Sequence, residues 1–346
     1  MLNNIKWLIS PEMAENCEEK EIVVSTRIRL ARNLAGIPFE IKMKQKDAEY
    51  LIQVVQSTIT GKLKGRYLLI QKLTPLERES LLESHLVSPA FVKADRPSAV
   101  FISEKGDISI MVNEEDHLRI QGLACGLSLT NTLLSVFEVE EFLGESLGYA
   151  FSEEYGFITS CPTNLGTGMR VSVLLHLPGL VYTNEVDKIL KSAVNLGMAV
   201  RGLFGEGTEI KGNLFQISNQ RTLGYTEEEL VQNINKFTKM VIDVEKKTRN
   251  LIYEKARYEF EDKIYRSLAI LTSARILSSD ETLGLLSAVR LGIGMGIIKN
   301  ISIDTINEIM LVSRPGNIQF YFGEILEEEE RDVKRAEYVR KKLQPN

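Results

Sequence analysis

Cysteine and histidine are both scarce in this sequence of 346 residues. The three cysteines, Cys17, Cys125 and Cys161, lie far apart and form no C-x-x-C pair. An odd number of widely spaced cysteines is typical of a reducing compartment and argues against a disulfide scaffold or a zinc knuckle. The three histidines form no ligand-like pair either, so we expect no structural metal site.

Long apolar runs and strong positive charge are also missing. No stretch approaches the ~20 apolar residues of a membrane span, and the opening MLNNIKWLISPEMAENCEEK has neither a basic leader nor an apolar signal core. The net charge of −5 argues against bulk binding to nucleic acid. With 44% hydrophobic and 26% charged residues, the composition is that of a folded globular protein. We expect a cytoplasmic protein with no membrane contact and no direct nucleic-acid binding.

Up to about residue 225, strand-like and helix-like patterns are mixed. Residues 21–34 alternate as a half-buried strand, in which we expect one face to hold Ile22, Val24, Ile28 and Leu30 and the other to hold Val23, Ser25, Arg27 and Arg29. Residues 97–123 indicate a hairpin around 105–107, whose second strand we expect to continue through the polar stretch NEEDHLR. Helical spacing marks the ranges 46–60, 74–87, about 130–147 and 183–198.

The pattern becomes helical at Thr226. The stretch TEEEL is a capping box, with Thr226 as N-cap and Glu229 at the third helical position. Helical spacing continues to about residue 299, and Pro315-Gly316 interrupts the remainder before a charged final helix at 325–343. We therefore expect an α+β domain in residues 1–225 and an all-helical domain in residues 226–346.

Several arginines stand where they could bind phosphate. Arg27 and Arg29 project from one face of the expected strand, while Arg119, Arg170 and Arg201 flank turns elsewhere. The guanidinium group stays charged and grips phosphate oxygens in pairs. From any single arginine, a solvated strand face with surface ion pairs is the simpler alternative.

Two carboxylates and one thiol accompany these arginines. Glu115 shares strand parity with Arg119, and Glu206 stands in a glycine-flanked turn, although both could be ordinary edge or turn acids. Cys161 opens the stretch SCPTNLGTGMRVS (160–172), and the following proline holds its backbone extended. That stretch lacks the Lys-Ser/Thr pair of a Walker A loop, and its thiol could be a buried, inert one.

Five segments appear together in a characteristic order: STRIRLAR, VNEEDHLRI, CPTNLGTGMR, RGLFGEGTE and ISNQRTLG. In this order they resemble the catalytic domain of the phosphagen (guanidino) kinases over roughly residues 22–225. The helical domain at the C-terminal end further resembles the bacterial protein arginine kinase family, McsB. The resemblance implies an antiparallel sheet flanked by helices and transfer of the γ-phosphoryl group of MgATP to arginine side chains of proteins.

The resemblance also implies site residues. Glu115 and Glu206 would hold the acceptor guanidinium, with Glu115 as the preferred base and Cys161 beside it in a positioning role. ATP would be bound by Ser25, Thr26, Arg27, Ile28, Arg29, His85, Arg119, Arg170, Val171, Ser172, Val173, Leu174, Arg201, Gly202, Leu203, Phe204, Gly205 and Glu206. Leu174 departs from the histidine of small-molecule arginine kinases, and Leu203 and Phe204 replace residues that are usually polar.

The final helix carries a second motif. Arg331 and Arg335 lie one helical turn apart with Asp332 between them, and the family resemblance implies that this R-D-x-x-R-A motif binds phosphoarginine. From the residues alone, a salt-bridged solvated helix is the alternative. The resemblance also implies a homodimer, an activator protein, a Clp ATPase partner and substrates that include a stress-gene repressor. A small-molecule guanidino kinase, or a phosphoarginine-binding adaptor with a degenerate kinase domain, remains an alternative function.

Overall fold

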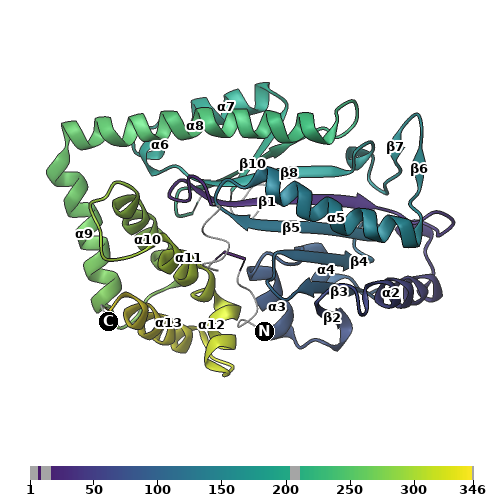
Figure 1. Ribbon diagram of the computed structural model, residues 1–346. Helices are drawn as coiled ribbons and strands as arrows, with labels where there is room; N and C mark the ends of the chain where they lie inside the picture. Colours follow the sequence, from purple (N-terminus) through teal and green to yellow (C-terminus); the bar gives the residue numbers. More distant parts are fainter. Residues whose placement is uncertain (1–6, 9–16, 203–210, 345–346) are drawn as a thin grey trace.

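The computed structural model describes residues 7–8, 17–202 and 211–344 of the chain (Figure 1). In this part of the chain one antiparallel sheet of eight strands has the order β2-β3-β4-β5-β1-β8-β10-β9. Its strands are β1 (Val23–Arg32), β2 (Gly65–Leu69), β3 (Ala99–Ser103), β4 (Ile108–Val112), β5 (Leu118–Cys125), β8 (Met169–His176), β9 (Met198–Gly202) and β10 (Leu214–Asn219). A small hairpin of β6 (Phe151–Ser152) and β7 (Gly156–Phe157) stands apart from it.

Helices cover both faces of the sheet and form the C-terminal part of the molecule (Figure 1). The helices within and against the sheet region are α2 (Gln45–Ile59), α3 (Pro75–Glu83), α4 (Pro89–Lys93), α5 (Leu129–Leu147), α6 (Pro178–Tyr182), α7 (Val186–Asn195) and α8 (Glu227–Lys255). The remaining helices are α9 (Arg257–Ser273), α10 (Ser279–Gly294), α11 (Ile303–Val312), α12 (Pro315–Phe322) and α13 (Glu328–Leu343). Short 3-10 turns occupy Glu40–Lys42, Ile70–Lys72 and Pro162–Asn164.

The two faces of the sheet bury different helices. On one face, the apolar residues of the central strands pack against α2, α5, α7 and α8, with Ile28 and Leu30 of β1 fully buried. On the other face, apolar residues of α3, α4, α10 and α11 pack near Leu123 and Leu174. Arg27 and Arg29 alternate with Ile28 and Leu30, so the arginines lie on this second face. The face that carries Arg27 and Arg29 is therefore the one that the C-terminal helices approach.

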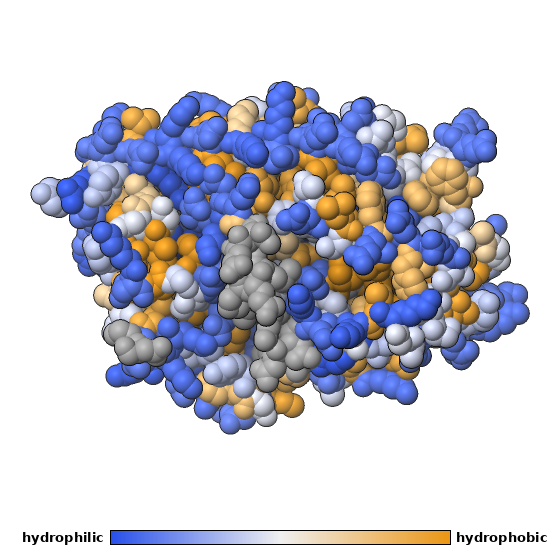
Figure 2. All heavy atoms as spheres, in the orientation of Figure 1, coloured by the Kyte–Doolittle hydropathy of each residue, from blue (hydrophilic) through white to orange (hydrophobic). Residues whose placement is uncertain are grey.

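Local sequence signals set several helix boundaries in the structure. Thr226 and Glu229 make the reciprocal capping-box hydrogen bonds at the start of α8. Thr74 caps α3, which begins at Pro75, and α5 ends before Gly148, whose φ is +67°. The long α8 lies along the upper edge of the molecule, and its outer side is hydrophilic (Figure 2).

The packing of α8 bears on the domain boundary. Its first half, from Leu230 to Ile242, packs into the core on the first face of the sheet. Ile252, near its end, joins the separate core of the C-terminal helices. The boundary at 225/226 stays a prediction, and this packing favours a boundary nearer the end of α8.

Three local expectations were wrong. Strand β1 has a register shift between Val23 and Ser25, so Val23 packs with Ile28 and Val24 packs on the opposite face. The strand at 108–112 does not continue through NEEDHLR, because the chain turns at Asn113, where φ is +65°, and β5 begins at Leu118. Pro315 does not interrupt a helix but is the first residue of α12.

The cysteine expectation was also wrong. Cys17 and Cys125 form a disulfide across a sequence separation of 108 residues. Sequence spacing gave no sign of it, because the two residues meet only when the segment before β1 bridges to the turn after β5, where Glu18 pairs with Leu127. Cys161 is the free cysteine among the described residues.

Candidate functional site

Four arginine positions converge on the second face of the sheet. Arg29 on β1 lies opposite Arg170 on β8, and Ala31 lies opposite Arg119 on β5. Residues that face each other across neighbouring strands project to the same side. Arg27, two residues before Arg29, shares that side. The alternation that the sequence predicted for the two β1 arginines is confirmed.

The cluster concentrates positive charge. Burial lowers the pKa of Arg29 well below its usual value, and the charges of Arg27, Arg119 and Arg170 lower it further, opposed by Glu114. Neighbouring side chains hold two of these arginines: Arg27 Nη2 donates to Gln216 Oε1 at 2.9 Å, and Arg170 Nη2 donates to Ser218 Oγ at 3.1 Å. Such a half-buried group of like charges favours a multivalent anion such as a polyphosphate.

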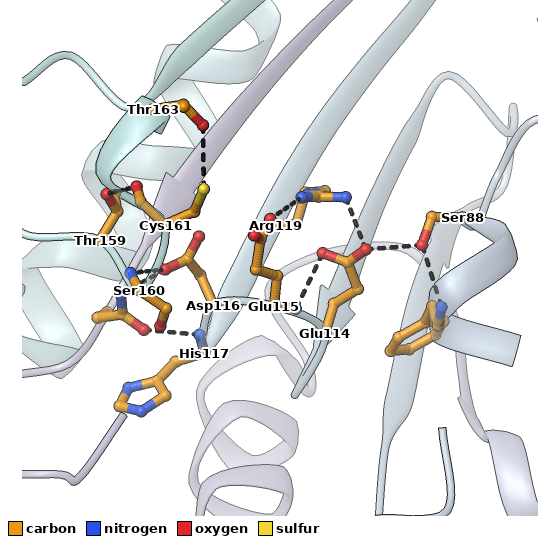
Figure 3. A network of polar contacts seen from close by, with 12 residues as sticks. Ser88, Glu114, Glu115, Asp116, His117, Arg119, Thr159, Ser160, Cys161 and Thr163 are labelled. Atoms are coloured by element: carbon orange, nitrogen blue, oxygen red, sulfur yellow. Dashed lines mark hydrogen bonds and ion pairs between the residues drawn. The ribbon is translucent and has the colours of Figure 1, made fainter. Parts of the chain in front are cut away.

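A turn of three acidic residues lies beside this cluster (Figure 3). Arg119 Nη1 lies 2.7 Å from Glu114 Oε1, and its Nη2 lies 3.1 Å from Glu115 Oε2. The Glu114 side chain is 4% exposed and also accepts a hydrogen bond from Ser88 Oγ at 2.7 Å. The Glu115 side chain is 42% exposed. Glu115 is therefore the carboxylate of this turn that a substrate could reach.

Cys161 is brought to the same turn by Asp116. The buried Asp116 Oδ1 accepts hydrogen bonds of 2.6 Å from Asn33 Nδ2 and from the Ser160 backbone N–H. Cys161 is half-buried and extended, with φ −98° and ψ 123°, as the following proline predicted. Its Sγ lies 3.0 Å from Thr163 Oγ1. Figure 3 shows Cys161 on one side of the acidic turn and Arg119 with Ser88 on the other.

A cavity of about 760 Å³ opens over the arginine face. The sheet contributes Arg27, Arg29 and Leu174, the α3–α4 connection contributes His85, and the C-terminal helices contribute Arg314. Trp7 lines it as well and stands edge-on to His85, with ring centroids 6.4 Å apart. Burial, and then the charges of Arg27 and Arg314, lower the pKa of His85 to about 3, so its imidazole is neutral at physiological pH.

The comparisons with known proteins agree with this geometry. The model of the ATP:guanido phosphotransferase C-terminal catalytic domain matches residues 47–248, and that of the protein-arginine kinase McsB C-terminal domain matches residues 257–346. The protein-arginine kinases of Bacillus pumilus (strain SAFR-032) and Bacillus subtilis (strain 168) are 43% and 41% identical over 344 residues, which are 98% of this chain and 94% of each relative.

The chain belongs to the ATP:guanido phosphotransferase family.

Solved structures of the family share the fold. The duplicated taurocyamine kinase of Schistosoma mansoni, with bound transition-state-analogue components, matches 65% of this chain and 33% of that chain with a TM-score of 0.60 and 30% identity. Lombricine kinase matches 66% of this chain and 68% of that chain with a TM-score of 0.61 and 24% identity. As a member of the family, this chain is an ATP-using phosphotransferase with the expected antiparallel sheet and a helical C-terminal region. Among its described residues, no helix has both the length and the apolar character to cross a membrane.

Not every residue predicted to bind ATP in this guanido phosphotransferase faces the cavity. Ser25, Ser172 and Leu174 line it with Arg27, Arg29 and His85. Ile28, Val171 and Val173 point into the opposite core, and Thr26 Oγ1 donates to the Gly126 carbonyl at 2.7 Å, so only their backbones are near the site. Arg201 and Gly202 belong to β9, where Arg201 lies opposite Gln216. Leu203, Phe204, Gly205 and Glu206 lie outside the described residues.

The glycines of the 160–172 stretch have a structural reason of their own. A Cβ atom on Gly166 would lie 2.8 Å from the Thr222 carbonyl oxygen, and one on Gly168 would lie 2.7 Å from the Ala31 carbonyl oxygen. The φ angles of both are positive, at +101° and +61°. The chain's own close packing therefore requires glycine at both positions.

The residues that are predicted to bind phosphoarginine lie in α13 of the helical region. Arg335 is 1% exposed, and its guanidinium donates to the carbonyl oxygens of Ser313 and Leu277 at 2.6 and 2.7 Å and pairs with Asp332. Arg331 Nη1 donates to the Leu326 carbonyl at 3.1 Å. Arg331 and Arg335 do lie one turn apart on α13, but their guanidinium groups bind different carbonyl oxygens, and the contacts of Arg335 fasten α13 to its neighbours. Their role in phosphoarginine binding stays a prediction.

Sequence reasoning missed several residues of the site. Glu114 and Asp116 flank Glu115 in the motif NEEDHLR. The run of three adjacent carboxylates in this motif was the signal that could have identified them. Trp7 and Arg314 carry no sequence signal, because tertiary packing alone brings these distant positions together around one cavity.

Proposed function

We propose that this enzyme transfers the γ-phosphoryl group of MgATP to the guanidinium group of arginine side chains in proteins. The observation that carries the proposal is the accessible Glu115 carboxylate beside a half-buried arginine cluster, with Cys161 across the turn. The names of the relatives that match nearly the whole chain support a protein substrate over a free guanidino compound.

The arginine cluster performs the electrostatic part of the reaction. Arg27, Arg29, Arg119 and Arg170 would bind the phosphates and stabilise the charge that develops on the transferred group. Mg²⁺ enters this proposal as part of the MgATP substrate and would supply further charge neutralisation there. The buried Glu114 keeps Arg119 in place while leaving the positive charge of the cluster in excess.

The acidic turn performs the acceptor part. A guanidinium is a poor nucleophile because it stays protonated below a pKa of about 12. Glu115 would orient it and accept the departing proton as the nitrogen bonds to the γ-phosphorus and the bond to the bridging oxygen breaks, releasing ADP. Glu206 is proposed as the second carboxylate. Cys161 would position the acceptor by contact and does not form a phosphocysteine intermediate.

The test is incubation of the enzyme with MgATP and either an arginine-rich protein or free arginine. Acid-labile phosphoarginine, read by mass spectrometry at neutral to alkaline pH, is expected on the protein. Phosphorylation of free arginine alone would assign the enzyme to the small-molecule guanidino kinases. Tight phosphoarginine binding without any transfer would instead make it an adaptor.

The cellular setting is proposed from the resemblance alone. Substrates would include a stress-gene repressor and proteins degraded through a Clp ATPase in the cytoplasm, and an activator protein would raise activity. The helical domain would form a homodimer and bind phosphoarginine through Arg331, Asp332 and Arg335. Phosphoarginine mapping in cells with and without the enzyme, together with light scattering of the purified protein, tests these points.

A further inference from the structure

We propose that the C-terminal helical domain supplies Arg314 and Asp280 to the nucleotide cavity, where they contact the nucleoside half of ATP. The proposal rests on the proposed function, because it takes the cavity to be the ATP site. It adds two binding residues from outside the catalytic sheet and couples nucleotide binding to the position of the helical domain.

The placement of Arg314 relative to the site is fixed by a polar joint. Glu83, at the end of α3, accepts the backbone N–H groups of Gly316 and Asn317 at 2.9 and 2.7 Å, at the N-terminus of α12. Ser80 Oγ donates to Asn317 Oδ1 at 2.7 Å. Because His85 follows α3 by two residues and Arg314 precedes α12 by one, this joint places both at the same wall of the cavity.

Arg314 lines the cavity and is half-buried there. Burial lowers the pKa of Arg314 despite the opposing charges of Glu83 and Asp280, and its own charge helps to lower the pKa of His85. Asp280, in the first turn of α10, forms an ion pair of 2.5 Å with Lys211, which lines the cavity too. The helical domain thus adds a cation and an anion to this wall.

The arrangement of the cavity indicates which half of the nucleotide Arg314 and Asp280 contact. Arg27 and Arg29 line the cavity, and the charges of Arg119 and Arg170 act on Arg29, so the part of the cavity beside Arg29 is the polyphosphate end. Trp7, His85 and Leu174 give the other part the flat and apolar character that suits a base. Arg314 lies close to His85, so its donors are placed for base or ribose acceptors, and Asp280 offers acceptors to ribose hydroxyls.

The chain contains a natural reporter for this test. Its single tryptophan is Trp7, which lines the cavity, so ligand binding should change the intrinsic fluorescence. We expect Arg314→Met to raise the Kd of MgATP by ~10-fold or more, as for a lost charge-assisted hydrogen bond, and to leave the Kd of Mg-triphosphate unchanged. Arg27→Met should raise the Kd of MgATP and that of Mg-triphosphate alike. Arg266→Met is the matched control, because Arg266 is exposed on α9, away from the cavity, and forms its ion pair with the neighbouring Asp262.

The outcomes separate the two proposals. If the wild-type protein does not bind MgATP, the proposed function fails. The inference is wrong if the wild-type protein binds MgATP and the Arg314→Met variant binds it equally well. It is also wrong if the affinity of the variant for Mg-triphosphate falls as much as its affinity for MgATP. Should Arg314→Met unfold, Asp280→Asn at the exposed start of α10 gives the same decision, since it too should weaken MgATP and spare triphosphate.

Discussion

Arg119 Nη1 lies 2.7 Å from Glu114 Oε1, and this buried ion pair leaves the next carboxylate in the chain free to face outward. Ser88 Oγ donates to the same Glu114 oxygen, and the Glu115 backbone N–H donates to the other, so protein groups hold both oxygens of the Glu114 carboxylate. Glu115 also forms an ion pair with Arg119, through the second guanidinium nitrogen, but its side chain remains exposed. Two adjacent glutamates thus have different tasks: Glu114 positions an arginine, and Glu115 is presented to the acceptor.

Replacement of Glu115 by glutamine should abolish most phosphoryl transfer. The amide keeps the size of the side chain but cannot accept the proton of the guanidinium, so kcat should fall by ~10²- to 10⁴-fold. The midpoint of thermal unfolding and the Kd of MgATP, measured by calorimetry and Trp7 fluorescence, should stay close to those of the wild type. An unchanged kcat would remove Glu115 from the role of base.

Glu114→Gln should behave differently, since it breaks a buried ion pair. Loss of a buried partner is destabilising by about 3 kcal/mol or more, so thermal unfolding should shift to lower temperature. Binding of MgATP should change as well, because Arg119 loses the group that holds it. Equal stability of this variant and the wild type would show that Arg119 does not depend on Glu114.

Cys161→Ser tests a positioning role for the thiol. Serine can keep the contact with Thr163 Oγ1, which lies 3.0 Å from Sγ, but places a smaller atom beside the acceptor. We expect kcat to fall by about 10-fold with little change in the Kd of MgATP. Mass spectrometry of the wild-type enzyme after a single turnover should find no phosphate on Cys161, and a phosphorylated Cys161 would contradict the assigned role.

The sequence predicted the arginine face well and the acidic turn for the wrong reason. Arg27 and Arg29 alternate with buried residues, and period-two alternation is a local property of a strand. Glu115 and Arg119 were paired by assuming a continuous strand, whereas a turn with Asn113 at positive φ brings them together. Trp7, Arg314 and the Cys17–Cys125 disulfide could not be predicted, because their contacts depend on how distant segments pack.

The Cys17–Cys125 disulfide predicts a defined thiol count. Protein purified without reductant and then unfolded should titrate with one thiol per chain, that of Cys161, and with three after reduction. A cross-link across 108 residues restricts the unfolded chain, so reduction should lower the free energy of unfolding by up to about 4 kcal/mol. Cys125→Ser should match the reduced protein. Three thiols in the oxidised preparation would contradict the pairing.

Gly168→Ala should be clearly more destabilising than a matched glycine substitution. A methyl group at Gly168 would meet the Ala31 carbonyl oxygen at 2.7 Å, and its φ of +61° strains any L-residue. We expect a loss of about 2 to 4 kcal/mol in the free energy of unfolding. Gly197→Ala has a similar φ of +73° with no atom within 4 Å, so it should lose only about 1 kcal/mol. Equal losses in chemical denaturation would show that close packing at Gly168 is unimportant.

Glu83→Gln should remove a pH dependence from the stability of the joint between α3 and α12. Burial raises the pKa of Glu83 from 4.5 to about 7, so between these values the folded protein binds a proton that the unfolded chain releases. The stability that this bound proton gives to the folded protein is fully present below pH 4.5 and is lost as the pH rises through 7. Glutamine has one acceptor oxygen and keeps only one of the two N–H groups of Gly316 and Asn317, so we expect it to be less stable than the wild type at pH 4.5 and to recover about 1 to 2 kcal/mol of the difference by pH 8, after allowance for solvent screening. Denaturant unfolding at several pH values measures this difference, with Glu138→Gln on the exposed face of α5 as the control. A stability difference that does not change with pH would contradict the raised pKa.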